Sequence, residues 1–324
     1  MRRHLLAICV STSLLFATTA SAQEPPARLP ARVSVASMSG TFAIQARPGD
    51  LVDATSVTVA VPQPGGGAVG LVDGDSTSEL LAIRTGSDGK VAVTYLTSSS
   101  SSTMVAAGTT TACQDDAFYL LDPLRDRWRS TPTWYFRSSS TPKELTVNQA
   151  EDGVTQSLSN IATARNDCGH SDFVDIGATY GGRTTLAPSM WRGANSLICD
   201  TVQYQDGKNV ISFTDRNGAV AAACIASKDL GVIGDPSDDG LVEVDIVLDK
   251  AVVQWYVQGR TTCGGNKKSV EAVVTHELGH GYGLDHVVEA SHPELTMSDG
   301  GIQNCQNSEA TLGMGDWLGL EALY

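Results

Sequence analysis

Apolar and polar residues alternate along the N-terminal part of the chain. Residues 32–112 contain no long stretch of helical periodicity and are rich in Ser, Thr, Gly and Val. Residues 57–61 and 91–95 alternate as half-buried strands do, and turn-forming residues at 62–67 and 87–89 follow or precede them. The pattern predicts a β-rich region, which could be an accessory β-sandwich domain or a β-rich propeptide.

The pattern changes near residue 131, where residues 131–136 predict an opening strand. Apolar residues then recur at helical spacing across 147–161, and Thr146 and Gln149 are spaced as a capping box. Further strands are predicted at 210–213, 219–223 and 242–248. This order of elements predicts an α+β domain in which helices pack on a sheet.

Residues 276–286 read H-E-x-x-H-x-x-G-x-x-H and are the most informative segment of the chain. His276 and His280 are four residues apart, so a helix would place their imidazoles on one face, one turn apart. Two imidazoles in this arrangement can share one zinc ion at nitrogen–metal distances of about 2.1 Å. Both histidines are therefore candidate zinc ligands.

The other fixed positions of this segment fit a catalytic zinc site. Gly283 suits a helix end, because glycine adopts the left-handed conformation without a Cβ penalty. The chain can then turn and bring in His286 as a third ligand. Glu277 stands beside the first ligand, where it can take a proton from an attacking water. Three protein ligands leave a fourth position for water, as in catalytic rather than structural zinc sites.

The eleven residues resemble the zinc-binding consensus of the metzincin metallopeptidases and are most similar to its matrixin-like branch. Residues 293–297, P-E-L-T-M, resemble the matrixin segment that ends in the Met-turn methionine, which favours Met297 over Met314 for that role. Residues 315–324 resemble the last helix of a matrixin catalytic domain. The likeness lies in motifs within 267–324, and upstream only the order of elements is similar.

The resemblance implies a fold and an activity. The fold would be metzincin-like, with a twisted mixed sheet, a long first helix and the zinc-binding helix at the floor of the cleft. The activity would be that of a secreted zinc endopeptidase, with one catalytic Zn2+ and Glu277 as general base, acting on protein or peptide substrates. Matrixins bind a second zinc through additional residues. Only His170 and His292 remain in the mature chain outside the motif, so that site is not expected and both are expected at the surface.

Two other functions stay open. The protein could be a non-catalytic, zinc-containing secreted binding protein or adhesin whose β-rich region makes the contacts. It could also be a metal-dependent hydrolase that acts on amides other than peptides. The presence of Glu277 argues against the first alternative, and the metzincin likeness favours protein substrates over the second.

The first residues of the chain predict export. Residues 1–22 combine a basic start at Arg2 and Arg3, an apolar stretch and an A-x-A cleavage site before Gln23. The apolar stretch is too short to span a bilayer, so we expect a secreted or periplasmic protein. The predicted division is a signal peptide at 1–22, a β-rich and immunoglobulin-like domain or propeptide at 23–125, and a zinc metallopeptidase domain at 126–324.

The cysteines agree with export. Cys9 would leave with the signal peptide, and the six that remain predict up to three disulfides of undetermined connectivity. The six are Cys113, Cys168, Cys199, Cys224, Cys263 and Cys305. Latent matrixins hold a cysteine on the zinc, and Cys113 has the right place in the order. Residues 111–115 do not match the matrixin switch sequence, so a disulfide is the favoured role for Cys113.

The net charge limits the classes of partner that the protein is expected to bind. The formal net charge is −14 at pH 7, and it becomes −16 without Arg2 and Arg3. This argues against nucleic acid and anionic membranes as partners, because both bind proteins through basic patches. Residues 235–240 are acidic and could form a Ca2+ loop, but they lack EF-hand spacing, so a solvated turn is favoured.

Overall fold

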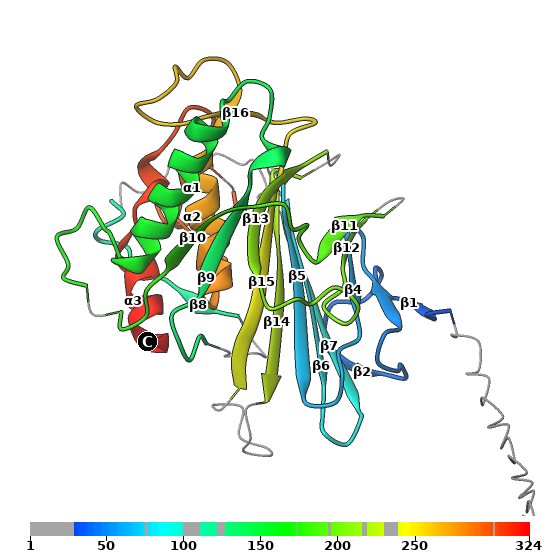
Figure 1. Cartoon of the computed structure of the whole chain (residues 1–324). Helices are drawn as coiled ribbons and strands as arrows, with labels where there is room; N and C mark the ends of the chain where they lie inside the picture. The colour runs from blue at the N-terminus through cyan, green and yellow to red at the C-terminus, as the bar shows by residue number, and fades with distance from the viewer. Residues whose placement is uncertain are drawn as a thin grey trace, which may run out of the picture. The chain divides into compact units, whose positions relative to one another are not determined.

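Residues 31–324 form one compact unit in the computed structural model (Figure 1). The structure describes residues 29–74, 77–99, 111–121, 127–172, 174–193, 196–215, 219–229, 239–300 and 302–324. The predicted signal peptide at 1–22 lies outside the described residues. None of the described helices is long and apolar enough to cross a membrane.

A nine-stranded sheet forms the centre of this unit. In spatial order its strands are β10 (Thr179–Thr184), β9 (Thr133–Arg137), β13 (Asn209–Thr214), β15 (Asp239–Asp249), β14 (Ala221–Asp229), β5 (Gly66–Asp73), β6 (Thr77–Thr85), β7 (Val91–Ser99) and β2 (Gly40–Ile44). The strands from β10 to β15 run parallel, and every pairing from β15 through β14 to β2 is antiparallel. The strands predicted at 91–95, 131–136, 210–213, 219–223 and 242–248 are thereby confirmed.

A second, five-stranded sheet mixes the two halves of the sequence. Its order is β1 (Arg32–Ser34), β3 (Leu51–Asp53), β4 (Val57–Ala60), β12 (Leu197–Cys199) and β11 (Met190–Arg192). Strand β12 pairs with β4 here, and β5 pairs with β14 in the larger sheet. The predicted boundary at residue 125 therefore does not divide the structure into two compact units, because strands from both sides of it share both sheets.

Two hydrophobic cores lie on opposite faces of the nine-stranded sheet. Along β14, Ala223 and Ile225 belong to one core, whereas Ala222 and Cys224 belong to the other. This is the alternation expected of a strand buried on both faces. The first core packs against the helices, and the second packs against the five-stranded sheet.

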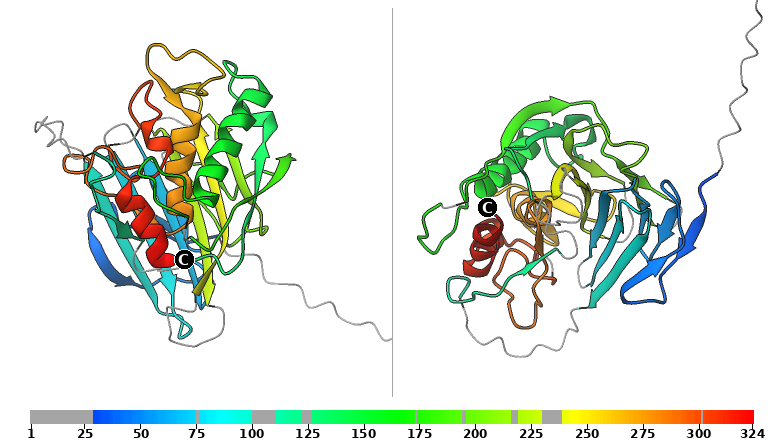
Figure 2. Two further views of the ribbon diagram at one scale, coloured as in Figure 1. Left: turned by 90° about the vertical axis from the view of Figure 1, so that its left-hand side faces the viewer. Right: turned by 90° about the horizontal axis from the view of Figure 1, so that it is seen from below.

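The α-helices of the described residues lie on the same side of the nine-stranded sheet, as Figures 1 and 2 show. They are α1 (Val147–Ala162), α2 (Val270–Gly281) and α3 (Met314–Leu323). The capping box predicted at the start of α1 is present, with Thr146 and Gln149 bonded to each other's backbone N–H groups. Helix α2 packs between α1 and the strands β14 and β15. Helices and mixed sheets together agree with the predicted α+β class.

Short elements connect these layers. They are β8 (Tyr119–Leu120) paired with β18 (Leu284–Asp285), β16 (Gln254–Tyr256) paired with β17 (Lys267–Ser269), and the single turns η1 (Ser138–Ser140) and η3 (Ser308–Ala310). Trp255 and Tyr256 are fully buried, so both pack in the interior.

Candidate metal centre

Helix α2 presents the first two predicted ligands. Ser269 caps its first turn by accepting a hydrogen bond from the Ala272 N–H at 3.2 Å. Every residue of α2 is buried, His276 with 4% of its surface exposed and His280 with none. As the four-residue spacing predicts, their imidazoles lie together, with ring centroids 4.9 Å apart.

The chain then turns back to bring in the third histidine. Gly283 has a φ of +100°, the left-handed conformation expected of a helix-ending glycine. Strand β18 follows and pairs with β8, which fixes the course of the chain into His286. The Nε2 atom of His286 lies 3.2 Å from Nε2 of His276 and 3.1 Å from Nε2 of His280.

Backbone carbonyls orient two of these rings. Nδ1–H of His276 donates to the Thr296 carbonyl at 2.6 Å, and Nδ1–H of His280 donates to the Leu284 carbonyl at 2.8 Å. A carbonyl can only accept, so in each neutral ring the proton sits on Nδ1 and the lone pair on Nε2. The lone pairs are thus aimed into the cluster, as second-shell hydrogen bonds do for metal-binding histidines.

Asp73, at the end of β5, completes the cluster. Its Oδ1 lies 3.0 Å from Nε2 of His286, and its Oδ2 lies 3.8 Å from Nε2 of His276 and 3.7 Å from Nε2 of His280. Ligand atoms of the four residues all lie within 4.8 Å of one another. Asp73 was not predicted from the sequence. The only local signal was a carboxylate after an apolar strand, which is weak evidence in a chain with 36 Asp and Glu.

The donor set fits a tetrahedral metal ion. Ligands about 2.1 Å from a central zinc would stand about 3.4 Å from each other at the corners of a regular tetrahedron. The Nε2 atom of His286 lies 3.2 Å and 3.1 Å from those of His276 and His280, close to that value. Asp73 approaches His286 with Oδ1 at 3.0 Å, and approaches His276 and His280 with Oδ2 at 3.8 Å and 3.7 Å. Three imidazoles and one carboxylate are also a donor set that zinc accepts. These residues could therefore hold a zinc ion.

The electrostatics favour the ligating forms of these groups. Burial, together with the neighbouring His286 and His276, holds the pKa of His280 well below its ordinary value. Burial alone would raise the pKa of Asp73, but the facing imidazoles of His286 and His276 hold it well below its usual range. Burial acts to lower the pKa of His286, but Asp73 outweighs it and raises that pKa. A neutral His280 and an ionised Asp73 are ready to bind a cation, whereas His286 would give up a proton as it does so.

Met297, the predicted Met-turn residue, packs against α2 at Gly279. It is 2% exposed, and its sulfur sits where the Cβ of any residue larger than Gly279 would have to be. A Cβ at Gly281 would meet Val244 at 3.1 Å and Trp134 at 3.4 Å, a tight contact but not the overlap found at Gly279. Two of the glycines that cost α2 helix propensity are thus explained by close packing against its neighbours.

A buried carboxylate holds the Met297 segment in place. Asp316, in the first turn of α3, accepts hydrogen bonds from the Thr296 N–H at 2.8 Å and the Met297 N–H at 3.1 Å. The same Thr296 supplies the carbonyl that orients His276. Asp316 therefore links α3 to the first histidine through a single residue.

Glu277, the predicted general base, is on α2 directly after His276 and has none of its surface exposed. A carboxylate in such an environment is shielded from bulk water. The structure thus places Glu277 in the same buried turn of helix as the two α2 histidines.

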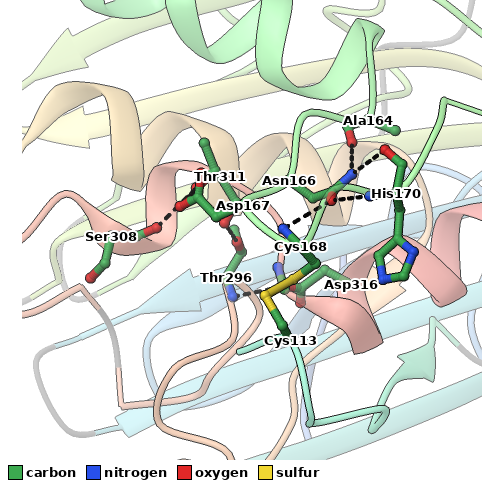
Figure 3. Close-up of a disulfide and its surroundings, with 11 residues drawn as sticks. Cys113, Ala164, Asn166, Asp167, Cys168, His170, Thr296, Ser308, Thr311 and Asp316 are labelled. Carbon is green, nitrogen blue, oxygen red and sulfur yellow. Dashed lines mark hydrogen bonds between the residues drawn. A yellow bond between two sulfur atoms is a disulfide. The ribbon is translucent and has the colours of Figure 1, made fainter. Parts of the chain in front are cut away.

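Cys113 forms a disulfide with Cys168 (Figure 3). It is not one of the cluster residues. The zinc-switch role considered for it is therefore wrong, and the favoured disulfide is confirmed. The other pairs are Cys199–Cys224 and Cys263–Cys305, so all six cysteines expected in the mature chain are paired. The position facing the histidines, which a switch cysteine would take, is held by Asp73.

The two remaining histidines lie outside the cluster. His170 stacks on Trp317 with ring centroids 4.7 Å apart, and His292 Nδ1 lies 2.8 Å from the carboxylate oxygens of Asp115. Among the described residues, Asp73, His276, His280 and His286 are the one group whose donors converge as metal ligands do. The candidate Ca2+ loop at 235–240 lies largely outside the described residues.

Comparison of the sequence with protein-family models finds no matching family, and comparison with curated proteins finds no match.

Proposed function

We propose that this protein is an exported zinc-dependent endopeptidase of the metzincin type. One observation carries the proposal: the Nε2 atoms of His276, His280 and His286 converge beside the buried turn of α2 that contains Glu277. The motif resemblance supplies the reaction class, hydrolysis of peptide bonds. Three disulfides and the expected signal peptide support a location outside the cytoplasm.

In this proposal each residue has a defined task. His276, His280 and His286 would hold the zinc ion, with Thr296 and Leu284 keeping two of the rings oriented. Bound zinc would supply Lewis-acid activation of water and of the scissile carbonyl. Glu277 would accept the proton of the attacking water and pass it to the amine that leaves. Met297 would support the α2 histidines by packing against Gly279, without acting as a ligand.

The fourth ligand candidate favours a second reading. Asp73 brings the number of protein donors to four, and closed four-ligand sites are typical of structural rather than catalytic zinc. A non-catalytic, zinc-containing secreted binding protein would have this arrangement permanently. The two readings differ in whether zinc at this site supports hydrolysis once Asp73 is removed.

Casein cleavage by the purified full chain tests the proposal, with zinc content measured for every preparation. Because Asp73 faces the metal position, Glu277→Gln is compared with its parent both in the wild-type chain and in an Asp73→Ala chain. We expect Glu277→Gln to keep one zinc per chain and to lose activity by about 10²- to 10⁴-fold, the contribution typical of a general base.

Glu271→Gln is the matched control, because Glu271 is also a buried carboxylate of α2. It bonds to Asn160 and Asn307 and is not part of the metal cluster. It should keep both zinc and activity. Zinc-loaded wild-type and Asp73→Ala chains that both leave casein intact would instead favour the binding protein. Chains without zinc would show that the three histidines are not ligands.

A further inference from the structure

Strand β5 brings Asp73 to the metal cluster from a distant part of the sequence. Residues 69 and 71 of β5 face the core beneath the helices, so by the period-two rule residue 73 faces the same side. The strand is paired along its length with β14 on one side and β6 on the other. At its end, the Asp73 carbonyl accepts a hydrogen bond from the Val220 N–H at 2.5 Å. The backbone therefore directs the Asp73 side chain toward α2.

Within the described part of the chain, the Asp73 carboxylate faces the three histidines. The residue is 7% exposed, so nine-tenths of it is removed from water. Among the described residues, no hydrogen-bond donor apart from the three imidazoles meets either oxygen. A buried carboxylate with a purely structural role would be expected to bond to backbone or hydroxyl groups. Asp316 does this, bonding to three backbone N–H groups.

The same strand covers a sheet edge that an extended peptide could use. Without β5, strand β14 would be the outer strand of the sheet formed by β10, β9, β13, β15 and β14. Unpaired edge strands bind extended peptides by adding them as a further strand. Strand β5 fills this place, antiparallel to β14, and ends at the metal cluster.

Residues 31–99, which include β5, are joined to the rest of the protein by the polypeptide chain and not by a disulfide. The three disulfides join residues between Cys113 and Cys305. Residues 31–99 contain no cysteine. The contact between Asp73 and the histidines is therefore maintained by strand pairing and packing, which are reversible.

We propose that Asp73 closes the fourth coordination position of the metal in the intact chain, and that this chain is the latent form of the peptidase. The inference rests on the proposed function, because latency has meaning only for an enzyme. It assigns β5 the part that an inhibitory segment plays: it lies along the edge strand and supplies a ligand where the attacking water would have to stand.

Cobalt substitution tests the closure separately from activity. The full chain is loaded with Co2+, whose visible absorption reports its ligands, and titrated with acetohydroxamate, a small chelator that needs a free coordination position. We expect the wild-type spectrum to stay unchanged and the Asp73→Ala spectrum to shift on titration. Asp88→Asn, which removes an exposed carboxylate from the turn before β7, should behave as wild type. Asp73→Asn keeps the side-chain volume, so it provides a second variant if Asp73→Ala does not fold.

Casein cleavage by the same preparations separates the two proposals. If the open form is populated to about 1–10% in the wild-type chain, Asp73→Ala should cleave about 10- to 100-fold faster. A wild-type spectrum that responds to acetohydroxamate as Asp73→Ala does would overturn the closure by Asp73, whatever the activity. An Asp73→Ala chain that opens to acetohydroxamate but cleaves nothing would uphold the closure and overturn the peptidase.

Discussion

Helix α2 and strand β5 both supply ligand candidates to the metal cluster, but they hold them differently. The α2 histidines are fixed by the protein itself, through carbonyl partners for each Nδ1 and close packing on Met297. Among the residues that the structure describes, Asp73 is held by its strand and by the imidazoles that it faces. The α2 histidines are therefore oriented before a metal binds, whereas the position of the Asp73 side chain depends on its contacts with the imidazoles.

This difference identifies Asp73 as the ligand candidate that can most easily move away from the metal position. Displacing His276 or His280 would break a buried hydrogen bond and disturb a packed helix, whereas displacing Asp73 would break contacts with the cluster alone. Removing residues 31–99 altogether would cost more, because β14 and β12 would lose strand partners and the second core would be uncovered. Opening of the site by a local movement of Asp73 requires less rearrangement than loss of the whole region.

Removal of zinc should cause the largest loss of stability, and the loss should be felt mainly in β5. At free zinc a thousandfold above its dissociation constant, binding stabilises the fold by about 4 kcal/mol, which chelation would remove. Because Asp73 depends on the cluster, we expect amide hydrogen exchange to quicken in β5 and change little in α2. Hydrogen-exchange mass spectrometry of the two segments, with and without chelator, measures this.

The control for this experiment is Asp73→Ala, in which zinc should no longer affect exchange in β5. The comparison between the two sides would be wrong if chelation loosened α2 first and left β5 protected.

Packing on the helix side should be the next most sensitive feature. Gly279→Ala would gain up to about 1 kcal/mol of helix propensity, but its Cβ would collide with the Met297 sulfur. We expect a net loss of about 3 kcal/mol in the free energy of unfolding, as overpacking of a buried site produces, together with weaker zinc binding. Urea unfolding of the zinc-free chain measures the first quantity. Gly264→Ala is the control, since its Cβ would have open space around it. A more stable Gly279→Ala chain would show that α2 is not packed as tightly as described.

The two sides of the cluster also differ in how far the sequence predicted them. His276, His280 and His286 lie within eleven residues, so helical spacing and one glycine turn were enough to place them together. The capping box of α1 and the strands at 210–213 and 242–248 are equally local and were also found. Such local features can be predicted from the sequence because they depend on the spacing of residues along one element.

Asp73 could not be predicted in this way. About two hundred positions separate it from His276, and its place in the cluster depends on the pairing of β5 with β14. Such pairing is decided by long-range packing, which leaves no fixed spacing in the sequence. The same reason explains why the boundary at residue 125 was drawn through an interleaved fold, and why the disulfide partner of Cys113 stayed open.

The smallest predicted effect concerns pH and again lies on the helix side. Turn η3 packs against α2, and its Glu309 is 3% exposed. Burial, with the charges of Glu294 and Glu289, raises the pKa of Glu309 from its ordinary 4.5 to about 7. Between these two values the folded chain binds a proton that the unfolded chain releases, so the free energy of unfolding falls as pH rises through this window. Allowing for relaxation around the charge, the loss should be about 2 kcal/mol, complete above pH 7.

Glu309→Gln should abolish this loss, because the amide stays neutral at every pH. Urea unfolding at pH 5 and pH 8 should show a smaller drop in the variant than in the wild type, while Glu321→Gln, on the exposed face of α3, should match the wild type. Both measurements are made on zinc-free protein, so that protonation of the ligands does not enter through metal binding. Equal drops in Glu309→Gln and the wild type would place the pH sensitivity elsewhere, with the His286–Asp73 pair on the strand side the next group to test.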